Sequence, residues 1–431
     1  MILVERELSG QRSRRRSSTR KADAKLSNAI LQLGIDLHRA VHSGCKAGDE
    51  PKDNLLLSPY QIASALQLLY TGAQGDTAAQ IGRAIGWPPQ LSSKAKKRVS
   101  RYFARRDHHV MQGDAKSGFK SYYDCCLHRE RGVALKTEFE AMLATGKASP
   151  SRQQSEESNT ESSAPSRRRR MRCREHDFVN DSVHQRWKME AQLTQAVPLL
   201  KGCGSYECLP WGSVGENTSL VLLCALGVKG RWRRRFDPAQ VREGVFYEPA
   251  NGELGCTDDQ FCPRPVVMMH QTGCFRMADC GELEATALEL PYKHAQRTLI
   301  ILLPQRRDGL DALEARMTAA ALAECIKNLK RRPYVDVSLP KFHMHSVADL
   351  VASLSSMGVD ALFQKGVADL SGMCSTEGVA LSSARHVAAF RASWKGASVA
   401  RRRLRSLPPS TRSSPWTDLF CSWCAASGPT P

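Results

Sequence analysis

The sequence predicts an α+β fold, and three observations support that class. Apolar residues recur at helical spacing near the N-terminus, strand-like apolar runs begin at His176, and the apolar content is high enough for a sizeable core. The length of 431 residues suffices for one large domain or two ordinary ones, and the 42% of hydrophobic residues suffices for a sizeable core. Strands and helices alternate irregularly, with long runs of antiparallel-looking strands, and this order favours an α+β architecture.

Two helical stripes lie between residues 24 and 86. Ser58 and Pro59 fit the start of the second helix, because a Ser side chain can cap free N–H groups and proline's fixed φ suits the first turn. Gly72 and Gly75 are predicted to end it, where a left-handed turn favours glycine. The stripes are Leu26, Ile30, Leu33, Leu37 and Val41, then Ile62, Leu66, Leu69 and Tyr70.

The strand-like runs of the second half have helices between them, predicted at Ala312–Leu329 and Ser346–Met357. Before these runs, residues 92–175 include a polar, Ser- and Arg-rich stretch without the apolar side chains needed to offset ordering entropy. We interpret 92–175 as a divergent, low-complexity insertion. The strand-like runs are residues 219–228, 264–270, 285–292, 297–304 and 334–345.

These patterns divide the chain into three parts. Residues 1–24 are expected to be a basic disordered arm, residues 25–400 a domain that contains the insertion, and residues 401–431 a basic, Pro- and Ser-rich tail. The tail is expected to replace the last elements of the domain.

The net charge of +19 lies largely in short basic runs. Such runs suit nucleic acid, heparin-like polyanions or anionic lipid, because clustered Lys and Arg release counterions on binding. They equally suit solvated tails and loops. We expect no specific nucleic acid and no membrane partner. The runs are Arg14–Arg16, Lys94–Lys97, Arg167–Arg170, Arg233–Arg235 and Arg401–Arg403.

The cysteines do not define a site. Fifteen are scattered along the chain, and the C-x-x-C at Cys421 and Cys424 has no second pair and no neighbouring His, so zinc and redox functions are not favoured and no disulfide framework follows. The charged residues Glu5, Arg6 and Glu7 do not fit a signal peptide. No apolar stretch of roughly 18 residues is present to span a membrane.

Several motifs, taken together and in order, resemble the serpin family. The matching segments are residues 54–81, 218–236, 266–276, 288–292, 299–304, 339–345 and 357–373. Within them, the residues that carry the family pattern are Asn54, Pro59, Lys229, Gly230, Trp232, Phe236, Pro340, Lys341 and Phe342. From local structure alone, Gly230 allows a tight turn and Trp232 fills a core space. Residues 178–196 resemble the helix that covers the family's central sheet.

The resemblance implies a fold with mixed β-sheets, a large central sheet and surrounding helices. It also implies a serine-type endopeptidase inhibitor whose exposed reactive loop is cleaved by a protease and then inserts into the central sheet. Strand addition supplies main-chain hydrogen bonds, so the native fold has to be kinetically trapped. The expected partner is a serine or cysteine protease, with a possible heparin-like polyanion, and an intact family member is expected to be a monomer. No enzyme activity, catalytic residue, cofactor or metal ligand is expected.

The resemblance also places two functional regions. The first is the shutter, where the sheet opens: Ser58 and His386 match the family, Cys224 replaces its Asn, and Gln61 replaces a second Ser. Since a thiol is a weak donor and acceptor, we expect this network to be weaker or rearranged. The family resemblance favours an extracellular location. Because the charged N-terminus does not fit a signal peptide, a cytoplasmic location is the alternative.

The second region is the hinge, where the loop enters. It should have an acidic residue, Gly, Thr or Ser, and then a run of Ala, because bulky or charged side chains are costly to bury between strands. Arg401–Arg403 stand where Ala belongs, so the hinge is degenerate. The residues at its start are Trp394, Lys395, Gly396, Ala397 and Ser398.

The genetic code indicates a shifted reading frame after about Phe390. Starting at the last base of the Trp394 codon, the codons give Glu, then Gly or Arg, and then permit Ser. Across 415–425 the same frame permits Val-Asp-Arg-Pro-Phe-Leu-Phe-Leu-Val-Arg, which resembles the family's C-terminal signature. Codon composition alone produces part of this agreement. Two hypotheses follow: a serpin-family inhibitor with a shifted C-terminus, or a non-inhibitory remnant or polyanion-binding scaffold without a usable loop.

Overall fold

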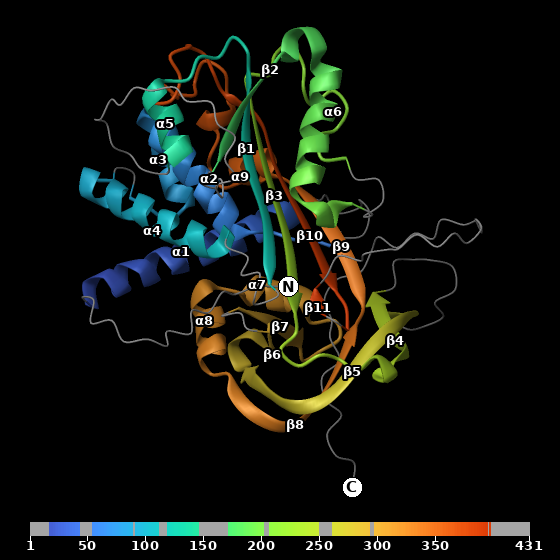
Figure 1. Cartoon of the computed structure of the whole chain (residues 1–431). Coiled ribbons are helices and arrows are strands. Elements are labelled where there is room, and N and C mark those ends of the chain that lie inside the picture. The colour runs from blue at the N-terminus through green and yellow to red at the C-terminus, as the bar shows by residue number, and fades with distance from the viewer. Residues whose placement is uncertain are drawn as a thin grey trace, which may run out of the picture.

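The computed structural model describes residues 17–43, 54–88, 91–111, 119–145, 171–201, 207–249, 261–293, 297–394 and 396–397. Its helices and strands form an α+β fold, as the sequence predicted (Figure 1). The helices are α1 (Ser17–Ser43), α2 (Pro59–Gly72), α3 (Gly75–Ala84), α4 (Ser93–Met111), α5 (Thr137–Thr145), α6 (Phe178–Ala196), α7 (Leu310–Arg316), α8 (Ala319–Lys327) and α9 (Leu350–Ser356).

The described strands form two sheets, of which the first is mixed and the second is antiparallel throughout. The first has the order β2-β1-β3-β10-β9, with β11 also paired to β3; the second has the order β4-β5-β6-β7, with β8 also paired to β5. The first sheet consists of β1 (Lys120–Glu130), β2 (Arg172–His176), β3 (Leu220–Arg231), β9 (Phe342–Asp349), β10 (Leu381–Ala392) and β11 (Gly396–Ala397). The second consists of β4 (Val241–Pro249), β5 (Phe261–Cys280), β6 (Ala285–Pro291), β7 (Thr298–Pro304) and β8 (Lys330–Pro340).

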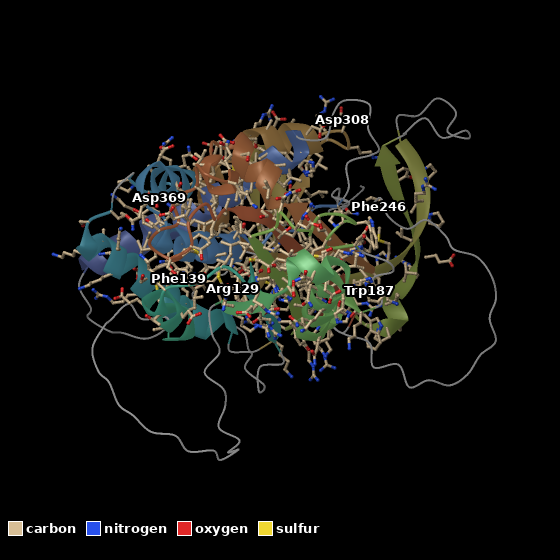
Figure 2. The ribbon with its side chains drawn as sticks, turned by 90° about the horizontal axis from the view of Figure 1, so that it is seen from above. Arg129, Phe139, Trp187, Phe246, Asp308 and Asp369 are labelled. Atoms are coloured by element: carbon tan, nitrogen blue, oxygen red, sulfur yellow. A yellow bond between two sulfur atoms is a disulfide. The ribbon has the colours of Figure 1, made fainter. Side chains whose placement is uncertain are left out.

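The first sheet is covered by helices on both faces. Figure 1 shows α6 on one side of β3 and β10, and α2 with α9 on the other. Because strand side chains alternate between faces, Leu222 of β3 packs in the cluster on the α2 side and Leu223 in the cluster on the α6 side. The outer face of α6 carries Trp187, whose side chain is 66% exposed (Figure 2).

The second sheet packs against α7 and α8 and joins the first through a mainly aromatic and aliphatic cluster. A disulfide between Cys280, at the end of β5, and Cys325, in α8, links sheet and helix. Scattered cysteines gave no basis for predicting this pair, since the two lie 45 residues apart in the sequence.

Two helix predictions need correction. The single helix expected at 312–329 is divided into α7 and α8, because Thr318 adopts an extended conformation and its side chain caps α8 by accepting from Ala321 N. The helix expected from Ser346 begins at Leu350 instead. Its N-cap is Asp349, and the preceding residues belong to β9, where they pair with β10.

The domain boundaries also need correction. The range 92–175, interpreted as a low-complexity insertion, contributes α4, β1, α5 and β2. The sequence pattern concealed β1 because this strand is central, so residues on both faces are buried and Asp124 interrupts the apolar run while pairing with Arg172. Residues 17–24 of the expected basic arm belong to α1. Residues 146–170 and the tail at 401–431 lie outside the described residues.

Candidate functional site

The centre of the first sheet is a direct parallel pair, β3 with β10. The paired segments are residues 220–228 and 381–390, which we call the seam. β1 pairs antiparallel with the outer edge of β3, and β9 pairs antiparallel with the outer edge of β10. The seam is therefore an interior junction, and no strand of the described chain lies within it.

The chain that follows β10 turns back onto β3. β11 pairs antiparallel with the end of β3, with Gly396 opposite Arg231 and Ala397 opposite Gly230. Trp394, half-buried, packs against the cluster that joins the two sheets. Two of the expected hinge residues, Lys395 and Ser398, lie outside the described residues. Gly396 and Ala397 of the predicted hinge therefore form a two-residue strand beside the seam.

Helix α2 supports the seam from one face. Ser58 caps the helix by accepting from Gln61 N at 3.3 Å, and Pro59 is its first residue, as the sequence predicted. The fully buried Gln61 side chain donates from Nε2 to the carbonyls of Asp124 at 2.6 Å and Ala225 at 2.9 Å. Gln61 thus joins α2 to β1 and β3 through one amide group.

His386 faces Cys224 across the seam. The two are register partners, and His386 is fully buried. Neither ring nitrogen of His386 has a hydrogen-bond partner among the described residues, and burial lowers its pKa to about 4 because desolvation disfavours the charged form.

Cys224 has a second neighbour that sequence reasoning missed. Its Sγ lies 3.3 Å from Cys125 Sγ, on the strand directly opposite in β1. Both side chains are buried, and no disulfide joins them. A strand prediction for 120–130 would have been the signal needed to find this pair. Of the four predicted shutter residues, Cys224 and His386 lie in the seam, Gln61 hydrogen-bonds to β1 and β3, and Ser58 caps α2. His386 makes no hydrogen bond with the described residues.

Aromatic packing closes the end of the seam near β11. The Trp232 ring stacks on Tyr292 at 4.9 Å between centroids, and Trp232 Nε1 donates to the Ser393 carbonyl at 3.0 Å. Gly230 does not make the tight turn that the sequence suggested: it lies in β3, and a Cβ there would stand 2.4 Å from the Tyr292 ring. Its role is to let Tyr292 and Phe119 approach the strand.

The remaining residues of the family pattern lie around this framework. Pro340 ends β8, Phe342 begins β9, and the exposed Lys341 between them donates its backbone N–H to the Val267 carbonyl at 2.8 Å. Asn54 is half-buried ahead of α2, and Lys229 is half-buried in β3. Their positions suit structural roles.

A pair of buried histidines marks the other edge of the first sheet. His128 Nδ1 and His176 Nε2 are 2.8 Å apart, between β1 and β2, and His176 Nδ1 lies 2.9 Å from Gln185 Oε1 of α6. Burial lowers the pKa of both rings, and the nearby cationic Arg174 lowers each further. Both histidines are therefore neutral at physiological pH.

An α+β fold with a large central sheet and surrounding helices is the architecture that the sequence resemblance implied, and the parallel seam is a feature that the structure adds. The family model described as Serpin (serine protease inhibitor) matches residues 28–162 and 206–416. The chain belongs to the serpin family.

Relatives and solved structures agree with this assignment. Ipis-1 of Ixodes persulcatus is 27% identical over 378 residues, covering 88% of this chain and 87% of that protein. Serpin B3 of Homo sapiens is 29% identical over 360 residues, with coverages of 81% and 82%. The crystal structure of uncleaved ovalbumin superposes with a TM-score of 0.69 at 21% identity, covering 86% of this chain and 87% of that one. No helix in the described ranges has the length and apolar character of a membrane span.

Proposed function

We propose that this protein is a serine-type endopeptidase inhibitor that works by cleavage of a reactive loop and insertion of the cleaved loop into the seam. The observation that supports this most directly is the course of the chain after β10, where β11 turns back and pairs antiparallel with β3. A longer segment following the same course enters between β3 and β10 as an added strand.

The pairing geometry supplies the driving force. β3 and β10 form a parallel pair, and parallel ladders are slightly less stable per residue than antiparallel ones. An inserted strand that continues β11 replaces that single parallel ladder with two antiparallel ladders. The closed sheet is then a kinetically trapped state whose conversion is released by cleavage.

The hinge sequence decides whether insertion proceeds. Trp394 is bulky, and Arg401–Arg403 carry charges whose burial between strands is strongly unfavourable. The shifted frame gives Glu, then Gly or Arg, and then permits small side chains, including Ser, Pro, Thr or Ala at each of Arg401–Arg403 if these use CGN codons. We therefore propose that the inhibitory product carries the shifted C-terminus.

The test compares two proteins, the 431-residue chain and the chain whose frame is shifted from Trp394 onward. Each is incubated with a panel of serine and cysteine proteases and analysed by denaturing electrophoresis. The shifted protein is expected to form an SDS-resistant covalent complex with at least one protease, and the 431-residue chain to form none. A complex formed equally by both proteins contradicts the role of the shift, and no complex with either contradicts inhibition.

Transcript sequencing across codons 390–425 tests the frame itself. We expect an insertion, a deletion or an alternative splice junction upstream of codon 394. Reads that keep the present frame, together with a native peptide Ser-Leu-Pro-Pro-Ser-Thr-Arg detected by mass spectrometry, contradict the proposal and favour a non-inhibitory remnant.

The alternative function, a polyanion-binding scaffold, has one observation in its favour. Arg231 and Arg233–Arg235 are exposed, whereas Trp232 and Phe236 are buried. If the arginines bind heparin-like chains, their replacement by Ala weakens binding far more than deletion of residues 1–24 does, and binding falls steeply with salt. Equal losses of binding in the two variants favour solvated loops.

We further propose that the inhibitor is extracellular and monomeric. Cell fractionation tests its location, and light scattering tests its oligomeric state.

A further inference from the structure

A cluster of metal-ligating side chains lies away from the seam, where α1 meets α7. It consists of His38 and His42 of α1 and Glu314 of α7, and their donor atoms all lie within 4.8 Å of one another. Residues four apart share one face of a helix, so both imidazoles point from α1 toward the same carboxylate.

The spacing within this cluster matches shared coordination. His38 Nε2 and Glu314 Oε1 are 3.5 Å apart, longer than the usual 2.7–3.2 Å hydrogen bond. Two ligands of a tetrahedral zinc ion, each about 2.0–2.2 Å from the metal, stand about 3.4 Å apart. The two imidazole rings are tilted by 59° with centroids 4.4 Å apart, so they converge rather than stack in parallel.

Contacts outside the cluster hold the two helices in position. Arg39 Nη2 donates to the carbonyls of Ala315 at 2.9 Å and Met317 at 2.7 Å, immediately after Glu314 in the chain. Gln32 Oε1 accepts from Ala319 N at 3.2 Å, at the start of α8. Because these bonds fix α1 against α7 and α8, the three ligands are brought together without a metal.

The cluster is accessible. The His38 and Glu314 side chains are each 22% exposed, and all three ligands line the same hollow between α1 and the second sheet. An ion therefore has a route to the site.

We propose that His38, His42 and Glu314 bind a divalent transition-metal cation, with Zn²⁺ as the ion that fits best. Two imidazoles and one carboxylate are a recurrent three-ligand zinc set, and imidazole disfavours Mg²⁺ and Ca²⁺, which prefer oxygen. The bound ion joins α1 to α7, two elements separated by more than 260 residues of sequence. Since it stabilises only the folded state, it raises the melting temperature in a concentration-dependent way.

The experiment uses the full chain with Zn²⁺ itself, titrated against a chromophoric zinc indicator at neutral pH. We expect one equivalent to bind, and His38→Ala, His42→Ala and Glu314→Gln each to weaken binding about tenfold or more. His184→Ala is the matched control, because His184 is an exposed histidine of α6, and it should bind as the parent does. Glu314→Gln keeps the side-chain shape, so its loss of binding reports the ligand rather than the fold.

Cobalt distinguishes this site from the cysteines. The parent protein loaded with Co²⁺ should show the d–d bands of a tetrahedral N/O site and no thiolate charge-transfer band. The three ligand variants should lose these d–d bands. The inference is overturned if the ligand variants bind as tightly as the parent, if the cobalt spectrum is that of thiolate coordination, or if the parent binds no zinc.

Discussion

Replacing His386 with Leu should remove a defined part of the protein's acid sensitivity. His386 is fully buried in β10, its two ring nitrogens have no hydrogen-bond partner among the described residues, and its pKa is lowered to about 4 from an ordinary value of 6.5. The folded state therefore keeps this ring neutral at pH values where the unfolded chain protonates it. Leu has a similar volume and no titrating group.

The sign and size of the effect follow from linkage. Below the unfolded pKa of 6.5 the unfolded state binds more protons than the folded state, so stability is lost as the pH falls through the interval from 6.5 toward 4. From about pH 7.5 to about pH 5 the loss attributable to His386 is about 2 kcal/mol, approaching about 3 kcal/mol below pH 4.

The assay is urea unfolding of the parent and of His386→Leu at both pH values. His128 and His176, whose pKa values are also lowered, add acid sensitivity to both proteins, so the informative quantity is the difference between the two losses. The variant should lose about 2 kcal/mol less than the parent. The control His184→Gln, at an exposed position, should behave as the parent does, and equal losses in parent and His386→Leu would refute the reasoning.

Three further changes have expected outcomes. Cys224→Asn places an amide opposite His386 and should raise the urea midpoint, with a gain of about 1 kcal/mol; an unchanged midpoint means that the two side chains do not meet. Trp232→Ala should lower the free energy of unfolding by about 3–5 kcal/mol. Trp187→Ala, at a side chain that is 66% exposed, should change it by no more than about 0.5 kcal/mol. Similar losses for the two variants in calorimetry contradict the assigned core. Arg172→Ala leaves the buried Asp124 carboxylate without its partner and should reduce stability by about 2 kcal/mol, discounted because Arg172 is partly exposed; Asp124→Asn made in addition should recover part of that loss.

Local patterns predicted much of this fold because they involve neighbours in sequence. Ser58 and Pro59 begin α2 as expected, since a cap and a first turn depend on adjacent residues. The bounds expected for the covering helix agree with α6, Phe178–Ala196. The α+β class followed from the order of such elements.

Other features depended on partners far away in sequence. β1 was missed because its buried carboxylate, Asp124, is paired with Arg172, 48 residues away in the sequence. Gly230 was assigned to a turn, yet its missing side chain makes room for Tyr292, 62 residues later. At the candidate site, the family pattern located His386 and Cys224, but the Cys125 thiol beside them depended on the register between β1 and β3.

The placement of β3 gives the sheet an all-or-none character. Leu222 belongs to one apolar cluster and Leu223 to another, on opposite faces of the same strand. Parting β3 from β10 is therefore expected to disturb both clusters together. Close-packed interiors switch between discrete arrangements rather than deform gradually. We therefore expect the seam to have two states, one closed and one open. How long it stays shut is set by the height of a barrier, not by progressive loosening.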